Sequence, residues 1–113
     1  MSPHDLTLGG AYYQVTYADP DMTIPGVMPM IYIGLNVLPN DDDPAADVYY
    51  FQDTVSHSWR GSVTDAGHSA KHPEIETMIY PQIKRDVENE VFTLAEVVAL
   101  VTAAYQRSQD LGR

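Results

Sequence analysis

A capping box near the C-terminus fixes where the clearest helix of this chain begins. In Thr93-Leu-Ala-Glu96, the Thr93 and Glu96 side chains can each bond the other residue's backbone N–H and so satisfy the first turn of a helix. Phe92 and Val97 occupy the two positions of a hydrophobic staple. The spacing therefore predicts a helix over about 94–109. Its expected core-facing stripe is Leu94, Val97, Val101, Ala104 and Tyr105.

The same helix is unusually apolar on its other faces. Thr102 is the only conventionally polar residue between Val97 and Tyr105, whereas a surface helix normally carries a wider polar face. Ala99, Leu100 and Ala103 lie outside the expected stripe. Two interpretations remain open: the sheet and loops cover most of the helix, or a second chain covers it. The second interpretation predicts a homodimer through the C-terminal helix.

Short runs of alternating apolar and polar residues precede the helix and are typical of β-strands. The clearest run is Ala11–Tyr17, with Met30–Leu35 and Val48–Gln52 further along the chain. The polar segment Asn40–Ala46 separates the last two, which predicts an antiparallel hairpin with an acidic tip. Gly34 lies inside the second run and can permit a bulge or a close backbone approach.

The pattern is weaker between the third strand and the helix. Ser58–Val63 is consistent with a further short strand, and Thr64–His72 resembles a loop. Ile75–Ile79 alternates like another short strand until Pro81 interrupts it.

Length and composition limit the fold further. The 113 residues are 44% hydrophobic and contain no cysteine, so packing and backbone pairing must hold the fold without disulfides or thiolate metal sites. We predict a single α+β domain over 1–113, with a small antiparallel sheet of about four strands and the helix at 94–109 packed on one face. There is no secretory leader pattern and no apolar run of the roughly 18 residues that a membrane span needs, so a cytoplasmic location is expected.

Charge is distributed unevenly along the chain. The first 59 residues hold eight carboxylates and no Lys or Arg, and the formal net charge of the whole is −10. Direct nucleic-acid binding is disfavoured, because phosphate recognition needs cations and the only basic cluster is Lys84-Arg85. A basic protein partner is the expectation, and simple solubility is the alternative.

The leading functional hypothesis is a small acidic protein-interaction module that binds, and regulates or inhibits, a basic partner. Immunity proteins and antitoxins share this charge and size, and the comparison goes no further. Aromatic anchors beside an acidic rim are typical of such surfaces. If one side of the sheet is open, the contact residues are Tyr12, Asp41, Asp42, Asp43, Tyr49, Phe51, Trp59 and Arg60. The alternative is that these rings fill ordinary hydrophobic clusters.

The second hypothesis is a small enzyme or ligand-binding domain. Its pocket would lie after the third strand and contain Asp53, His57, Trp59 and Arg60. Asp53, His57 and Ser58 also suggest a Ser/His/Asp arrangement, but no Gly-x-Ser-x-Gly elbow is present. A plainer interpretation is a polar turn in which the side chain of Asp53 or Thr54 bonds a nearby backbone group.

Metal binding is weakly indicated. His68 and His72 have the spacing of a helical metal pair, and His57 offers a third nitrogen, but Gly67 and Pro73 enclose the pair in what resembles a loop. The carboxylates of Asp41, Asp42, Asp43 and Asp47 suggest calcium, yet the EF-hand pattern is absent. No metal and no cofactor is expected.

Overall fold

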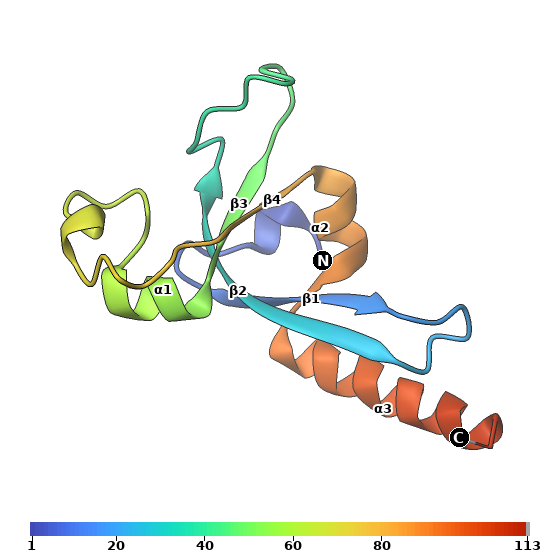
Figure 1. The fold of residues 1–113 in the computed structure, drawn as a ribbon. Helices are drawn as coiled ribbons and strands as arrows, with labels where there is room; N and C mark the ends of the chain where they lie inside the picture. The colour runs from blue at the N-terminus through green and yellow to red at the C-terminus, as the bar shows by residue number, and fades with distance from the viewer. Residues whose placement is uncertain (113) are drawn as a thin grey trace.

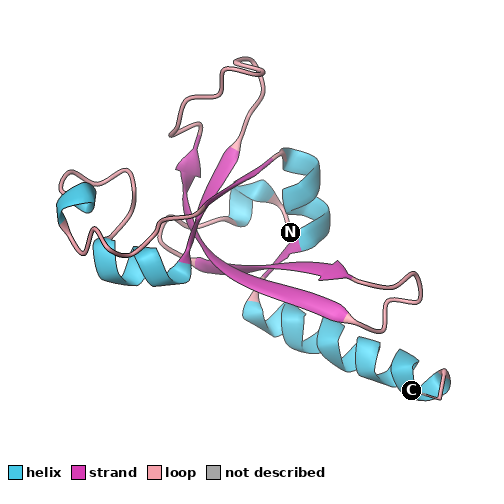
Figure 2. Cartoon of the chain, in the orientation of Figure 1, coloured by secondary structure: helices cyan, strands magenta, loops and turns pink. Residues whose placement is uncertain are grey.

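The computed structural model describes residues 1–112 and arranges them around one antiparallel sheet (Figures 1 and 2). Two short 3-10 helices, η1 (Pro3–Asp5) and η2 (His68–Ala70), accompany the main elements. Those elements are β1 (Ala11–Tyr17), β2 (Pro25–Leu35), β3 (Tyr49–Asp53), α1 (Thr54–Arg60), β4 (Ile79–Gln82), α2 (Lys84–Glu90), β5 (Val91–Phe92) and α3 (Leu94–Asp110).

The sheet has the strand order β4-β3-β2-β1-β5, and all its pairings are antiparallel. The α+β class is confirmed, with five strands instead of about four. The predicted hairpin is also confirmed, because β2 pairs with β3 across the acidic loop. The additional strand is β5, a two-residue strand that pairs with Tyr13 and Gln14 of β1.

Prolines lie inside two of the strands. β2 begins at Pro25 instead of Met30, because residues 25–29 pair with β1. These residues have no partner on their other side, since only the second half of β2 pairs with β3. Pro81 lies in β4, which forms an outer edge of the sheet. Proline has no N–H to donate, so it is tolerated where one side of a strand has no partner.

Gly34 forms the predicted irregularity in β2. The register with β3 shifts between Tyr32 and Gly34, and Gly34 has a φ of 138°. A Cβ there would lie 2.5 Å from Cγ1 of Val37. Both the bulge and the close approach of a neighbouring segment therefore require glycine at this position.

The segment after β3 is helical, so the prediction of a strand over Ser58–Val63 is wrong. α1 spans Thr54–Arg60, and the Asp53 side chain accepts the Ser56 backbone N–H as an N-cap. Gly61 ends the helix with a φ of 78°. Asp53 is a preferred N-cap residue and Gly61 a preferred terminator; these are the sequence signals that could have identified the helix.

The main core lies on the face of the sheet that α2 and η1 cover. Its fully buried members include Met30, Phe51, Val87 and Val91. The N-terminal amino group of Met1 donates to the carbonyl oxygens of Val87, Glu88 and Val91 at 3.0–3.3 Å, which fixes the chain start against α2. The short helix α2 was not predicted, because its seven residues carry only one buried side chain.

The predicted capping box of α3 is confirmed in full. The Thr93 side chain accepts the Glu96 N–H, and the Glu96 carboxylate accepts the Thr93 N–H at 3.0 Å. The helix runs to Asp110, one residue beyond the prediction. Figure 1 shows it lying along the β1–β2 hairpin.

The predicted core stripe of α3 is wrong for three of its five members. Val97 and Ala104 are buried, as expected. Leu94, Val101 and Tyr105 are exposed, because α3 contacts the narrow β1–β2 hairpin, which covers little more than one line of side chains.

Candidate functional site

The acidic loop is held at its base by Asn36. This residue has a φ of 54°, and its side-chain oxygen accepts the Val48 N–H at 2.9 Å while its backbone N–H donates to the Val48 carbonyl at 2.8 Å. Its side-chain amide also donates to Asp47 at 3.0 Å. Asparagine tolerates the left-handed region better than most residues, so it closes the hairpin with three hydrogen bonds.

The loop tip presents free carboxylates. Asp41, Asp42 and Asp43 are all exposed, and no Lys or Arg forms an ion pair with them among residues 1–112. The ion pair that residues 1–112 do contain, between His72 and Glu74, lies outside this loop. The Asn40 side chain donates to the Asp43 carbonyl at 2.9 Å, which folds the tip back on itself. Figure 1 shows this loop extending well beyond the strands it connects.

A cleft of about 400 Å³ lies at the base of the tip. Asp41 and Asp42 line it together with an apolar group formed by Pro39, Val48, Tyr50 and Pro81. The Tyr50 hydroxyl donates to the Leu38 carbonyl at 3.2 Å and so holds the ring in the cleft wall. Apolar walls with a carboxylate rim match a Lys or Arg side chain, which has a hydrocarbon stem and a charged head.

Three of the predicted aromatic anchors are not on the surface. Tyr12, Tyr49 and Phe51 are at most 9% exposed and belong to the main core. Tyr12 meets Phe51 edge to face at 6.4 Å between ring centroids, and its hydroxyl accepts the Thr7 N–H at 2.7 Å. The expectation of an open aromatic sheet face is therefore wrong at these positions, because α2 and η1 cover that face.

Trp59 and Arg60 have different environments. Trp59 is 58% exposed and its ring lies 5.2 Å from that of His72. Arg60 donates to the carbonyls of Lys71 and Ile75 and to the Thr77 hydroxyl at 2.8–3.0 Å. Arg60 thus anchors the segment that leads into β4. Trp59 is the predicted aromatic anchor that does lie on the surface.

Asp53 has a structural role. Besides capping α1, its carboxylate accepts the Ser56 hydroxyl and the Met78 N–H. Partial burial raises its pKa, but these hydrogen bonds outweigh that effect and the pKa is lowered overall. The expected local side-chain to backbone bond of Asp53 is confirmed, but it caps a helix where a polar turn was predicted.

A buried glutamine missed by sequence reasoning completes this region. Gln52 is fully buried; it donates to the Ser56 hydroxyl and the Gly61 carbonyl and accepts the Val63 N–H at 2.8 Å. Ser56 is itself fully buried, which leaves no path for a substrate to its hydroxyl. No sequence signal separates this glutamine from a solvent-facing one on an alternating strand.

The three central histidines have separate environments. His68 is 8% exposed, with Nδ1 3.0 Å from the Gly61 carbonyl and Nε2 3.1 Å from the Thr77 hydroxyl. Since a carbonyl oxygen only accepts, Nδ1 carries the proton. His72 contacts Glu74 and Trp59. Over residues 1–112, no group of three His, Asp or Glu side chains is arranged to hold a metal ion, which applies to the acidic loop as well.

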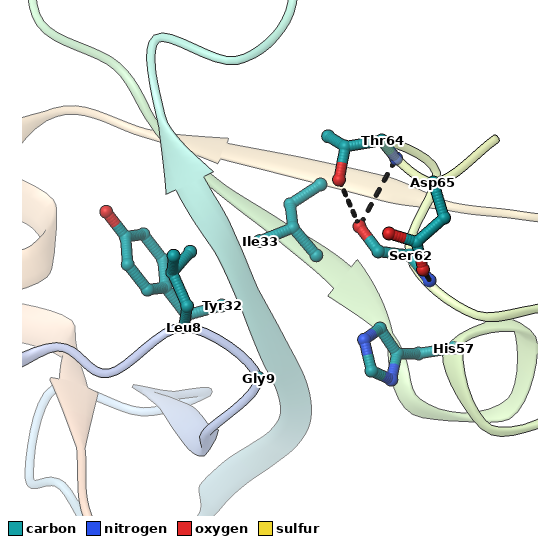
Figure 3. Close-up of a pocket in the computed structure, with 8 residues that line it drawn as sticks. All are labelled: Leu8, Gly9, Tyr32, Ile33, His57, Ser62, Thr64 and Asp65. Carbon is teal, nitrogen blue, oxygen red and sulfur yellow. Dashed lines mark hydrogen bonds between the residues drawn. The ribbon is translucent and has the colours of Figure 1, made fainter.

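His57 lines a second, polar cleft of about 300 Å³ between α1 and the segment before β1. Figure 3 shows its imidazole below Ser62, Thr64 and Asp65, with Tyr32 and Ile33 on the strand side. Ser62 and Thr64 bond each other through their hydroxyls at 2.7 Å. Asp53, Trp59 and Arg60 are not among the residues lining this cleft, so the four residues of the predicted pocket do not line one cleft.

In the described part of the chain, every helix is too short or too polar to cross a bilayer. Compared with known proteins, the chain matches no family model, no curated protein and no solved structure.

Proposed function

We propose that this chain is a non-enzymatic interaction module that binds a basic protein through its acidic hairpin loop. The observation that carries the proposal is the cleft below the loop tip, where Asp41 and Asp42 stand at the rim of an apolar hollow. A basic side chain of the partner fits with its stem against Pro39, Val48 and Tyr50 and its charge at the carboxylates.

The charge of the surrounding surface supports the same partner. The loop segment itself carries Asp41, Asp42, Asp43 and Asp47 with no Lys or Arg, so the field at the loop is negative. Such a field accelerates encounter with a cationic surface and orients it before contact. Inhibition or regulation of the partner would follow if the occupied basic surface is the partner's working site.

Backbone amide NMR with a short arginine-containing peptide tests the cleft directly. Signals from Asn40–Asp42 and Val48–Tyr50 are expected to shift on titration, and Asp42→Asn should weaken the peptide affinity. Asp43→Asn is the matched control, because it removes the same charge from the same loop at a residue that does not line the cleft. If the two variants weaken the peptide affinity equally, the interaction is a general attraction between charges, and the proposal of binding in the cleft is contradicted.

Affinity capture from the native cell extract then tests the biological partner. A stoichiometric basic protein that binds the unmodified chain, is released by salt and binds Asp42→Asn less tightly than Asp43→Asn would support the proposal. Recovery of the chain alone would contradict it.

The His57 cleft offers a second candidate, a ligand-binding domain. This candidate rests on a cleft of about 300 Å³ that the His57 imidazole lines together with Ser62, Thr64 and Asp65. That volume is at the lower limit for small-molecule pockets. A melting-temperature screen against small polar metabolites, repeated with His57→Ala, tests this alternative, since a ligand of the folded state raises the melting temperature.

A further inference from the structure

Helix α3 carries an exposed apolar stripe. Leu94, Val98, Val101 and Tyr105 are 59%, 61%, 40% and 63% exposed. They recur at intervals of four, three and four residues and so share one face of the helix. No charged residue occurs between Glu96 and Arg107. An exposed helix face of this kind normally meets another apolar surface.

The spacing of the stripe is self-complementary. The interval order four, three, four is the same in both directions, with its midpoint between Val98 and Val101. Two copies of α3 packed antiparallel about a two-fold axis at that midpoint place Leu94 opposite Tyr105 of a second copy. They also place Val98 opposite Val101 of that copy. Ala95 and Thr102, which flank the stripe, are small enough for close helix packing at about 8–10 Å.

The accessible surface of the whole chain is larger than that of a compact monomer of the same mass, as expected for a subunit without its partner. The chain has a mass of 12.6 kDa and an accessible surface of 6919 Å², against about 6,200 Å² for a compact monomer of that mass. The excess of about 700 Å² is close to the roughly 800 Å² that each partner contributes to a standard interface.

The shape points the same way. The radius of gyration is 16.1 Å, against about 13 Å for a compact domain of this length. Figure 1 shows that α3 and the β1–β2 hairpin extend together away from the rest of the molecule. The excess surface is therefore shared by this arm and by the other projecting segments, the acidic loop and the region of α1 and η2.

Charge favours a second copy over a basic partner at this face. The stripe offers no carboxylate to a cationic surface, so the partner proposed for the acidic loop has no complement here. A net charge of −10 opposes self-association in general, but the acidic loop lies at the opposite end of the molecule from α3 (Figure 1). Joining two copies through α3 therefore does not bring the carboxylates of Asp41, Asp42 and Asp43 together.

We propose that α3 is a homodimerisation helix, which binds a second copy of this chain antiparallel through Leu94, Val98, Val101 and Tyr105. The inference does not depend on the function of the acidic loop. A dimer of this kind leaves both loops accessible and makes the molecule bivalent for a partner with repeated sites.

Sedimentation equilibrium over a range of protein concentrations tests the proposal. The unmodified chain is expected to reach twice the 12.6 kDa chain mass, and Val98→Glu to remain monomeric because it buries a charge near the axis. Val55→Glu is the matched control: Val55 is 57% exposed on α1, so the same substitution there should leave the dimer intact. Circular dichroism checks that each variant is folded.

A second variant tests the antiparallel register. Adding Val101→Lys to Val98→Glu places opposite charges across the proposed axis, so the double variant should recover the dimer. A monomeric unmodified chain, or a Val98→Glu variant that dimerises as strongly as Val55→Glu, would overturn the proposal. A folded double variant that stays monomeric would overturn the antiparallel register.

Discussion

The Asp53 carboxylate accepts a 2.8 Å hydrogen bond from the backbone N–H of Met78, 25 residues further along the chain. The same carboxylate caps α1 through the Ser56 N–H. One side chain therefore fixes the start of a helix and the approach to an edge strand, which makes the long segment between them a closed loop.

Asp53→Asn is expected to destabilise the fold by about 1.5–3 kcal/mol, the usual contribution of a hydrogen bond to a charged group, because the amide cannot replace all the bonds that the carboxylate accepts. Asparagine is a good N-cap in general, but here both carboxylate oxygens accept and an amide has only one acceptor. Urea denaturation measures the difference, with Asp43→Asn as an exposed control. A loss no larger than that of the control would show that the Met78 bond contributes little.

The contribution of Asp53 should also depend on pH. Its pKa is lowered in the folded state, so its stabilisation is present above the unfolded value of about 3.9 and is lost as the pH falls through the folded pKa. The stability difference between the unmodified chain and Asp53→Asn should therefore narrow on acidification. Urea titrations at several pH values below 6 measure this, and a constant difference would contradict it.

Gly34→Ala is expected to destabilise the fold for two separable reasons. The new Cβ would lie 2.5 Å from Cγ1 of Val37, and the φ of 138° is strained for any residue with a side chain. Adding Val37→Ala removes the first cause and leaves the second, so the double variant should recover part of a loss of about 1–3 kcal/mol. Thermal unfolding of Gly34→Ala and of the double variant, with Val37→Ala alone as the reference, separates the two causes. If the double variant recovers no stability, the whole loss comes from the strained backbone.

Gln52→Glu preserves the shape of a fully buried side chain and changes its hydrogen bonding. The carboxylate keeps the acceptor for the Val63 N–H but faces the Gly61 carbonyl where an amide donated. Burial and this contact disfavour the charged form, so the variant should be less stable than the unmodified chain at pH 7 and recover as the pH falls. If the stability of Gln52→Glu changes with pH as that of the unmodified chain does, the inference that residue 52 is held in a buried hydrogen-bond network is contradicted.

Arg107 joins the C-terminal half of α3 to the β1–β2 hairpin. Its guanidinium donates to the Met22 carbonyl through two nitrogens at 2.7 and 3.0 Å and lies 5.9 Å from the Tyr17 ring centroid. Arg107→Ala should increase amide hydrogen exchange in residues 103–110, while the hydrogen-bonded amides of residues 97–101 in the N-terminal half of α3 keep their protection. Arg85→Ala, at an exposed position of α2, is the control and should leave exchange in α3 unchanged.

Several features followed from local sequence because their physics is local. The Thr93–Glu96 capping box placed the start of α3, and the polar segment Asn40–Ala46 placed the hairpin loop. Gly34 was identified as a bulge because few other residues adopt its backbone conformation. For the capping box and for Gly34, the decisive hydrogen bonds or dihedral angles lie within a few residues; the hairpin loop was marked by its local polar composition, although the bonds of Asn36 that close it span 11 and 12 residues.

The local rules failed where more than one interpretation satisfied them. The segment after β3 had the cap of a helix in Asp53 and its terminator in Gly61, yet the Ser58–Val63 segment, with Trp59 and Val63 as its apolar residues, also suited a short strand. Local rules predict that Pro81 ends a strand, but β4 is an edge strand and accepts proline. Whether a strand lies at an edge depends on distant pairing partners.

By itself, the sequence determined the α+β class, the position of α3 and the acidic character of the hairpin loop, since these depend on near neighbours and on composition. Only the tertiary structure decided that Tyr12, Tyr49 and Phe51 face the core and that Gln52 and Asp53 hold the segment that follows β3. It also decided that α3 leaves an apolar stripe uncovered, formed by Leu94, Val98, Val101 and Tyr105. Alternation specifies that a strand has two faces, but which face is covered depends on where α2 and η1 pack, and that is a property of the whole chain.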